Sequence, residues 1–301
     1  MGLVDEVKMV SHARDWRGRS RTPRSAERWA APKERREFPT AWARTTPARL
    51  ARAGIQRGLL GPLVWSQVSP RVYGADRLDR VDGPVVIVAN HSSHLDTPLL
   101  LRSLPPRLAQ HVAVGAAADY FFDARWRATV SALMFNAFPV ERLGNRRIKS
   151  IAPELLAEGW NLLLFPEATR SPDGWMHPFR LGTAQLCCNA GVPAVPVAIR
   201  GAYAAMPRGR NWPRPGRPRI AIRFGPPLVP ETGETAADFS VRMLDAVTQL
   251  WAEEELGWWG SSRAAGTLMP PTGPAGAEWR RQWEATRPLP DAGARGRIWR
   301  P

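Results

Sequence analysis

The heptad Asn90-His-Ser-Ser-His-Leu-Asp96 carries the residues with the clearest capacity for chemistry. It places His91 five residues before Asp96, directly after the apolar run at 84–89. A carboxylate bonded to one ring nitrogen of a histidine fixes the tautomer, orients the ring and stabilises the imidazolium as it forms. The pair can therefore act as a general base on a hydroxyl group that a substrate brings. In the alternative interpretation, His91 is a loop histidine bonded to backbone.

The elements around this pair are predicted from local patterns. The run 84–89 is rich in valine and isoleucine, which predicts a buried strand. Ser92 or Ser93 can cap a helix that begins near Leu95. Open α/β folds place their chemistry at such strand-to-helix corners, so we expect His91 at the mouth of a cleft.

Two further apolar runs end in charged residues. The run 161–165 leads into a loop that holds Glu167, Thr169 and Arg170, and another run ends at Arg142. Because guanidinium groups form forked, charge-assisted bonds to phosphate oxygens, two arginines at neighbouring strand ends predict a phosphate clamp. In the alternative interpretation, the arginines form surface ion pairs with nearby glutamates, which stabilise a protein little.

Four ordered blocks of the chain together resemble the lysophosphatidic acid acyltransferase family, glycerolipid acyltransferases with an H-x4-D motif. The blocks are Asn90–Asp96, Phe138–Arg142, Phe165–Ser171 and Val192–Val197. The resemblance spans about residues 73 to 228. Two positions depart from the family pattern: Ala168 stands where glycine is usual, and Arg180 replaces a lysine while keeping the positive charge.

The resemblance implies an α/β fold with a mixed central sheet flanked by helices. It also implies transfer of a fatty acyl group from acyl-CoA or acyl carrier protein to the free hydroxyl of 1-acyl-sn-glycerol 3-phosphate, which gives phosphatidic acid. In this scheme His91 removes the hydroxyl proton, Asp96 holds the ring, and the alkoxide attacks the thioester without an acyl-enzyme.

The same resemblance assigns the substrate contacts. The expected substrate-binding residues are Asn90, Ser93, Arg142, Glu167, Thr169, Arg170 and Arg180. Arg142 and Arg170 would hold the phosphate, and Glu167 would orient the glycerol hydroxyl. We expect backbone amides near His91 to stabilise the oxyanion. We expect neither cofactor nor metal, since His94 has no clustered ligands at zinc-like spacing, and we interpret it as a solvated residue of the first helical turn.

Composition predicts where the protein works. The formal net charge is +15, the sequence pI is about 11.3 and there are 14 tryptophans, a combination that favours an anionic membrane surface. No RNA-binding module is recognisable, so nucleic acid is not an expected partner. The sequence shows no spanning stretch of about twenty apolar residues, no signal peptide and no disulfide framework. We therefore expect a cytoplasmic protein, peripheral on the inner face of the cell membrane.

Four segments are expected. Residues 1–46 are basic and predicted to be disordered, and 47–72 form amphipathic helices that either contact the membrane or pack on the domain. Residues 73–256 form the acyltransferase domain, closed by a helix at 238–255, and 257–301 form a loose tail. The basic loop at 208–217 either faces lipid headgroups or is solvated.

Other functions stay open. The same dyad could act on another lysolipid, on glycerol 3-phosphate or on an amine-bearing lipid. A function of a different class is that of a non-catalytic basic protein that binds anionic membrane or nucleic acid.

Overall fold

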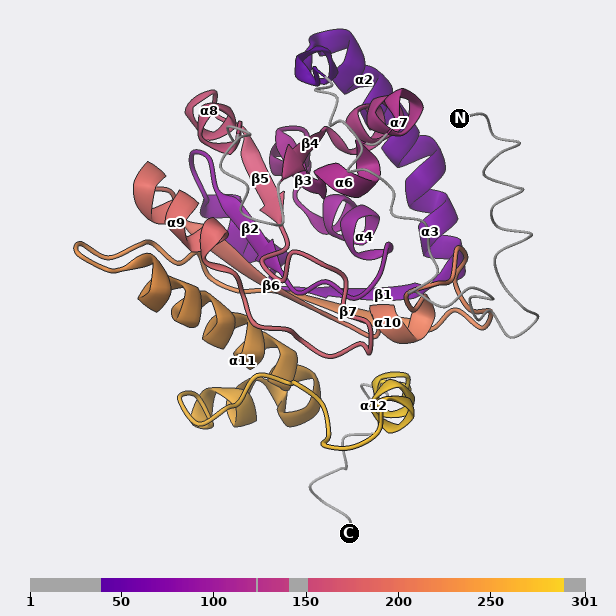
Figure 1. The fold of residues 1–301 in the computed structure, drawn as a ribbon, viewed down its shortest axis with the longest axis vertical. Coiled ribbons are helices and arrows are strands. Elements are labelled where there is room, and N and C mark those ends of the chain that lie inside the picture. Colours follow the sequence, from indigo (N-terminus) through magenta and orange to yellow (C-terminus); the bar gives the residue numbers. More distant parts are fainter. Residues whose placement is uncertain (1–38, 123, 141–150, 290–301) are drawn as a thin grey trace, which may run out of the picture. The chain divides into compact units, whose positions relative to one another are not determined.

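Seven strands form one sheet at the centre of the protein (Figure 1). The computed structural model describes residues 39–122, 124–140 and 151–289. In sheet order the strands are β1 (Ser69–Tyr73), β7 (Arg219–Phe224), β6 (Ala194–Arg200), β2 (Val86–Ala89), β5 (Asn161–Leu164), β3 (Val112–Ala117) and β4 (Ala137–Val140). Only the β6–β7 pair among these is antiparallel, so the predicted mixed sheet is confirmed.

Both faces of the sheet are covered by helices. Alternate residues of β2 point to opposite faces: Ile87 joins one apolar cluster, and Val86 and Val88 join the other. The first cluster contains α4 (Asp96–Ser103), and the second contains residues of α8 (Ala152–Ala157), α9 (Leu181–Ala190) and α11 (Ala236–Arg263). Burial on both faces explains why β2 is apolar throughout and β5 is apolar after Asn161, rather than alternating.

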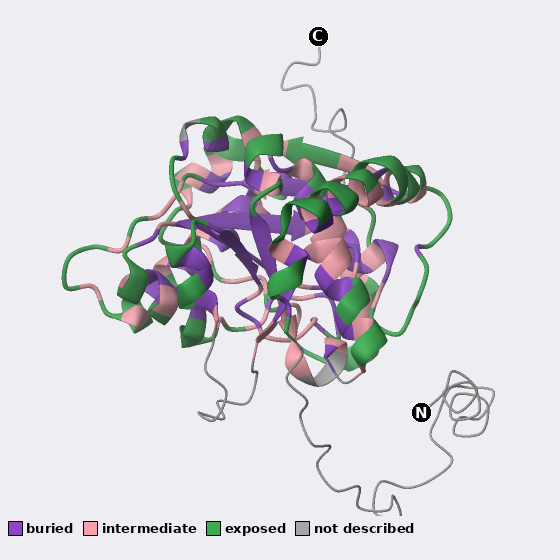
Figure 2. Cartoon of the chain, turned by 90° about the horizontal axis from the view of Figure 1, so that it is seen from above, coloured by how far each residue is buried: buried purple, intermediate pink, exposed green. Residues whose placement is uncertain are grey.

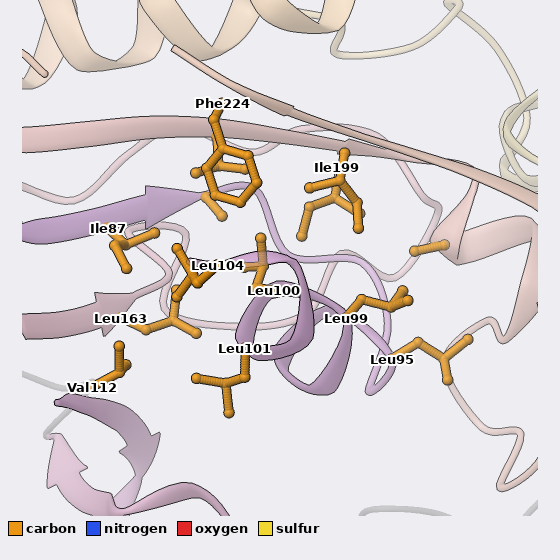
Figure 3. Packing of buried hydrophobic residues seen from close by; sticks show 14 of the residues in the cluster. Ile87, Leu95, Leu99, Leu100, Leu101, Leu104, Val112, Leu163, Ile199 and Phe224 are labelled. Carbon is orange, nitrogen blue, oxygen red and sulfur yellow. The ribbon is translucent and has the colours of Figure 1, made fainter. Parts of the chain in front are cut away.

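Helix α4 is fixed against the sheet by its leucines. Figure 3 shows Leu99, Leu100 and Leu104 beside Ile87 and Ile199 of the strands. Each fully buried leucine contributes about 1.5–3 kcal/mol through the apolar surface it removes from water. The outer surfaces of the helices are exposed, whereas the central strands β2, β5 and β6 are buried and the edge strand β1 is partly exposed (Figure 2). The helix that carries Asp96 is therefore held rigidly against the strand that leads to His91.

The remaining helices connect and flank these elements. They are η2 (Ala41–Arg44), α2 (Thr46–Ile55), the π-helical η3 (Gln56–Leu60), α3 (Gly61–Gln67), η4 (Ala75–Arg80), α5 (Pro106–Ala109), α6 (Ala118–Phe121), α7 (Arg125–Phe135), α10 (Ala202–Ala205) and α12 (Glu278–Ala285). Both cysteines lie on α9 as free thiols, and Cys187 is buried, as expected of packing residues. None of the described helices combines the length and the apolar character that crossing a membrane requires.

The N-terminal helices pack on the domain and also present leucines outward. Arg52 of α2 is buried and donates to the carbonyls of Ala132 and Leu133 in α7. On the outer side, Leu50 and Leu59 are exposed. The segment therefore combines features of both predicted alternatives. Its helices end at Gln67, earlier than the expected residue 72, because Ser69–Tyr73 pairs with β7 as a strand of the sheet.

The two chain ends differ from the expected segments. Disorder was predicted for residues 1–46, of which 1–38 lie outside the described residues. Within the rest, η2 already spans Ala41–Arg44 and α2 begins at Thr46. Helix α11 contains the predicted closing helix and continues to Arg263 across a break at Gly257. The expected loose tail is structured over residues 264–289, because Arg281 of α12 binds Asp173. The rest of the tail lies outside the described residues.

Candidate active site

His91 and Asp96 meet at the corner between β2 and α4, as predicted. The Nδ1–H of His91 donates to Asp96 Oδ2 at 2.9 Å. Asp96 is fully buried, and its Oδ2 also accepts the backbone N–H groups of Ser92 and Ser93, each at 2.8 Å. Because Oδ2 already accepts from these two donors, the proton of the third bond belongs to the ring. The Nε2 atom of neutral His91 is then left as a proton acceptor.

The start of α4 differs in detail from the predicted serine cap. Leu95 occupies the N-cap position, and Asp96 is the first residue of the helix. The Ser93 hydroxyl accepts from Leu95 N–H at 3.2 Å and donates to the carbonyl of Met206 at 2.8 Å. The corner is therefore folded around the Asp96 carboxylate and the Ser93 hydroxyl together.

The His91 ring is fixed by an aromatic neighbour. Phe165 stacks on it with a centroid separation of 4.0 Å and an interplanar angle of 19°. Phe165 directly follows β5, the neighbour of β2 in the sheet, so the two corners come together at the same edge. The stack and the Asp96 bond restrict ring rotation, while 17% of the His91 side chain stays exposed.

Glu167 supports the backbone behind the ring. Its Oε1 accepts the backbone N–H of His91 at 2.7 Å, and its Oε2 accepts that of His177 at 3.0 Å. Burial raises the pKa of Glu167 to about 8, and the two backbone donors act in the opposite direction. The expected contact with a glycerol hydroxyl is not what the structure shows, because both carboxyl oxygens are engaged and the side chain is almost fully buried.

Asn90 and Ser93 also hold backbone. The Asn90 amide group donates to the carbonyl of Ile199 and accepts its N–H, at 2.8 and 2.7 Å, which ties the corner to β6. Both Asn90 and Ser93 are buried, and neither is among the residues that line the cavity beside His91. In the structure these two expected substrate contacts are thus positioning groups.

A cavity of about 880 Å³ opens beside His91. Three of its lining residues are arginines, Arg170, Arg180 and Arg208, and none of its lining residues in the described chain is acidic. Thr169 lines it as well. The structure therefore brings Thr169, Arg170 and Arg180 together with His91, as predicted, and adds Arg208. Arg142 lies outside the described residues.

Apolar residues form the wall on the other side of the cavity. They come from β3, β4, α6 and α7 and include Val114, Ala117, Phe121, Phe135 and Val140. The arginines come instead from the segment between β5 and α9, which holds Arg170 and Arg180, and from the loop after α10, which holds Arg208. A single space thus joins a cationic side to an apolar side, with His91 in its wall. Such a space suits a molecule that carries both an anionic group and a hydrocarbon chain.

His94 is not the solvated residue that the sequence suggested. It is half-buried, lines the cavity and makes an edge-to-face contact with Phe121 at 6.4 Å. Burial lowers the pKa of His94 to about 4, and the charge of Arg170 adds to this effect. His94 is therefore neutral at pH 7 and contributes a polar group to the cavity wall without a positive charge.

The predicted oxyanion donors must be revised. The backbone amides of His91, Ser92 and Ser93 all donate to carboxylates, so these three are committed. Within the described chain, no cluster of three histidine, cysteine or acidic side chains could hold a metal ion.

Sequence reasoning also missed Phe165 and Arg208 as site residues, although the phenylalanine stands in the third motif.

Comparisons with known proteins find relatives of part of the chain. A family model described as Acyltransferase matches residues 69–200. The chain is 32% identical over 154 residues to a 1-acyl-sn-glycerol-3-phosphate acyltransferase of Chlamydomonas reinhardtii, which covers 50% of this chain and 45% of that protein. It is 29% identical over 119 residues to one of Pseudomonas aeruginosa, which covers 38% and 42%. The chain spans about half the length of the curated relatives it matches.

The fold has a counterpart among solved structures. The crystal structure of the 1-acyl-sn-glycerophosphate (LPA) acyltransferase from Thermotoga maritima matches with a TM-score of 0.51. The match covers 70% of this chain and 81% of that chain at 24% sequence identity, and so concerns the fold. The resemblance that the four motifs predict is confirmed: residues 69–200 form an acyltransferase domain like that of the 1-acyl-sn-glycerol-3-phosphate acyltransferases.

Proposed function

We propose that the protein transfers a fatty acyl group from a thioester, acyl-CoA or acyl carrier protein, to the free hydroxyl of 1-acyl-sn-glycerol 3-phosphate. The observation that carries the proposal is the His91–Asp96 bond in the wall of a cavity that has both arginines and an apolar side. The relatives named as enzymes of this activity support the choice of acceptor.

The proposed transfer assigns the proton steps to the His91–Asp96 pair. His91 Nε2 accepts the proton of the acceptor hydroxyl, and Asp96 stabilises the imidazolium that forms. The alkoxide oxygen bonds to the thioester carbonyl carbon, the carbon–sulfur bond then breaks, and the leaving thiolate takes the proton back from His91. The products are phosphatidic acid and a free thiol. Binding both substrates in one cavity makes the reaction effectively unimolecular, which supplies much of the rate.

The cavity also explains how one site would hold both ends of the acceptor. Arg170, Arg180 and Arg208 would hold the phosphate, because they line the cavity and guanidinium groups match phosphate oxygens. The apolar side would take an acyl chain. No cofactor enters this scheme, in which the acyl thioester is a substrate.

We propose further that the protein works at an anionic membrane surface. Leu63 of α3 lines the cavity and is itself partly exposed, and Leu59 beside it is exposed, so an apolar outer surface is continuous with the cavity. Trp212 lines the cavity from the basic loop and is also exposed. Indole and guanidinium groups both suit the headgroup region. That this membrane is the inner face of the cell membrane stays a prediction of the sequence.

The test uses the purified full chain, a labelled acyl-thioester and a panel of acceptors. The panel contains 1-acyl-sn-glycerol 3-phosphate, glycerol 3-phosphate, a lysolipid with a zwitterionic headgroup and a monoacylglycerol. We expect thioester consumption with the phosphate monoester that carries an acyl chain, and its loss in the His91→Ala variant. If no acceptor consumes the thioester in a His91-dependent way, the proposal is wrong.

A further inference from the structure

The loop Ser171–His177 holds the backbone of His91 on both sides. The backbone N–H of Ser171 donates to the carbonyl of His91 at 2.8 Å. The backbone N–H of His177 donates to Glu167, whose other carboxyl oxygen accepts from the N–H of His91. The position of the His91 backbone therefore depends on the shape of this loop.

Asp173 keeps that loop folded. Its Oδ1 accepts from the Ser171 hydroxyl at 3.1 Å and from the backbone N–H of Trp175 at 3.2 Å. The Ser171 hydroxyl in turn accepts the N–H of Gly174 at 2.8 Å. Asp173 is buried, so its charge needs a close partner.

That partner is Arg281, which lies 108 residues later in α12. Its Nε and Nη2 atoms lie 2.7 and 2.6 Å from Asp173 Oδ2, and its carbonyl accepts the indole N–H of Trp175 at 2.9 Å. Burial alone would raise the pKa of Asp173, but the bonds from Arg281, Trp175 and Ser171 outweigh it and lower that pKa. The pair is thus a part-buried, doubly bonded ion pair, and losing Arg281 would leave the buried Asp173 carboxylate without its charged partner.

The arm around Arg281 packs closely on the same loop. Gly174 has a φ of 87°, and a Cβ atom there would lie 2.6 Å from the Tyr203 ring and 2.7 Å from the Cβ of Ala285. The backbone N–H of Met176 donates to the carbonyl of Pro271 at 3.0 Å. Helix α12 therefore lies directly against the loop, on the side of α10 (Figure 1).

We propose that the C-terminal arm, residues 264–289, positions the active site, and that Arg281 acts through Asp173 to hold the backbone of His91. The arm lies outside residues 69–200, so the family match assigns it no role. Arg281 touches no reacting atom in this scheme and is a positioning residue. The inference rests on the proposed function for its kinetic readout, because a displaced base raises the barrier to proton transfer.

The kinetic test compares Arg281→Ala and Arg281→Lys in the full chain, with Arg287→Ala as the matched control from an exposed site of the same arm. We expect Arg281→Ala to lower kcat by about tenfold or more while KM for both substrates stays within about twofold. Lysine should restore part of the rate, since it keeps the charge but cannot form the fork. Arg287→Ala should behave as wild type.

A double-mutant cycle with Asp173→Asn tests the route. If Arg281 acts through Asp173, the double variant should be no slower than the slower single variant. Multiplicative losses in kcat would overturn this route. A kcat per folded molecule that stays at the wild-type value in Arg281→Ala, whatever the change in unfolding free energy, would overturn the positioning role.

A spectroscopic readout separates this inference from the proposed function. The chain has five histidines, and ¹⁵N-histidine labelling with His91→Gln for assignment reports the His91 ring nitrogens. We expect Arg281→Ala to shift the His91 Nδ1 signal and Arg287→Ala to leave it unchanged. An unchanged signal in Arg281→Ala overturns the inference even if the enzyme is active. If wild type consumes no thioester, the proposed function fails, but a shifted signal still supports the arm's role.

Discussion

Glu167 lies behind His91, and its carboxylate accepts the backbone N–H of that histidine at 2.7 Å. The residue that the third motif presents next to the His91 corner thus fixes the main chain of the first motif. Its second oxygen accepts the backbone N–H of His177. Two corners at neighbouring strand ends are joined through one buried carboxyl group. This relationship gives the buried Glu167 side chain a structural role behind the cavity wall.

The protonation of Glu167 predicts a pH-dependent stability. In the native state its pKa is raised to about 8 by burial, whereas the unfolded chain releases this proton near 4.5. Between these values the native state binds more protons, so raising the pH favours unfolding. Relative to Glu167→Gln, wild type should lose up to about 1.4 kcal/mol of unfolding free energy per pH unit in this window. Urea denaturation of wild type and Glu167→Gln from pH 4.5 to 8 measures the unfolding free energy of each. If the two free energies change with pH in parallel, the raised pKa of Glu167 is contradicted.

Ala168 predicts a stabilising substitution. It adopts a φ of 59°, in the left-handed region that favours glycine, at the position where the family usually has that residue. A left-handed alanine costs about 1–2 kcal/mol in the native state. Glycine removes this strain, but part of the gain is offset because glycine gives the unfolded chain more conformational entropy. Ala168→Gly should raise the unfolding free energy by roughly 0.5–1 kcal/mol. Ala51→Gly, in the exposed middle of α2, should lower it by about 1 kcal/mol. If both substitutions lower the unfolding free energy, Ala168 is not strained.

The arginines of the cavity predict recognition of phosphate. Arg170→Ala should raise KM for 1-acyl-sn-glycerol 3-phosphate by about tenfold or more, because it removes a hydrogen bond between charged groups. Arg170→Lys should recover part of the loss. The slower reaction with a monoacylglycerol, which has no phosphate, should hardly change in either variant. Steady-state kinetics of the variants with both acceptors test this prediction. If kcat/KM falls equally for both acceptors, Arg170 does not contact the phosphate.

The apolar side of the cavity predicts a limit on acyl-chain length. Ala117 of β3 lines this side, and leucine there would occupy the space of two or three methylene groups. Each buried methylene contributes about 0.8 kcal/mol, so Ala117→Leu should move the preference towards shorter chains by about tenfold or more. Ala190→Leu, at an exposed end of α9, is the control. An unchanged ratio of kcat/KM across a series of acyl-thioesters would place the chain elsewhere.

Local patterns predicted the centre of this structure. The apolar runs at 84–89, at 161–165 and before Arg142 predicted β2, β5 and β4, and the spacing of His91 and Asp96 predicted the dyad. Strand β3 was missed because Val112–Ala117 consists largely of alanine and glycine, which are weak strand formers, although the sheet needs small residues there to leave a cavity.

Contacts between distant residues were beyond sequence reasoning. Asn90 reaches Ile199 over 109 positions, and Arg281 reaches Asp173 over 108. Neither partner carries a local signal, since a buried amide and a paired arginine look like ordinary polar residues in a sequence. For this reason the sequence predicted that Asn90 and Ser93 contact the substrate, whereas both bind backbone groups. It likewise predicted a loose tail, whereas residues 264–289 are structured.

Removing the charge of Asp96 measures how far the rate of acyl transfer depends on that carboxylate. In Asp96→Asn the side-chain oxygen can still accept from Ser92 and Ser93, so the corner should fold. The imidazolium would lose its carboxylate, and the ring could reverse its tautomer. We expect kcat to fall by about 10³- to 10⁴-fold with little change in KM. Circular dichroism checks the fold beside the kinetics, and a folded variant with near-normal kcat would exclude an electrostatic role for Asp96.

Single-turnover release of thiol tests the central claim most directly. Excess wild-type protein, His91→Gln or His91→Ala is mixed with labelled acyl-thioester and 1-acyl-sn-glycerol 3-phosphate, and free thiol and phosphatidic acid are followed together. The structure predicts rapid formation of both products by wild type in equal amounts, and a loss of at least about a thousandfold in the two variants while they still bind both substrates. Acyl transfer at the wild-type rate by folded His91→Ala would contradict the account.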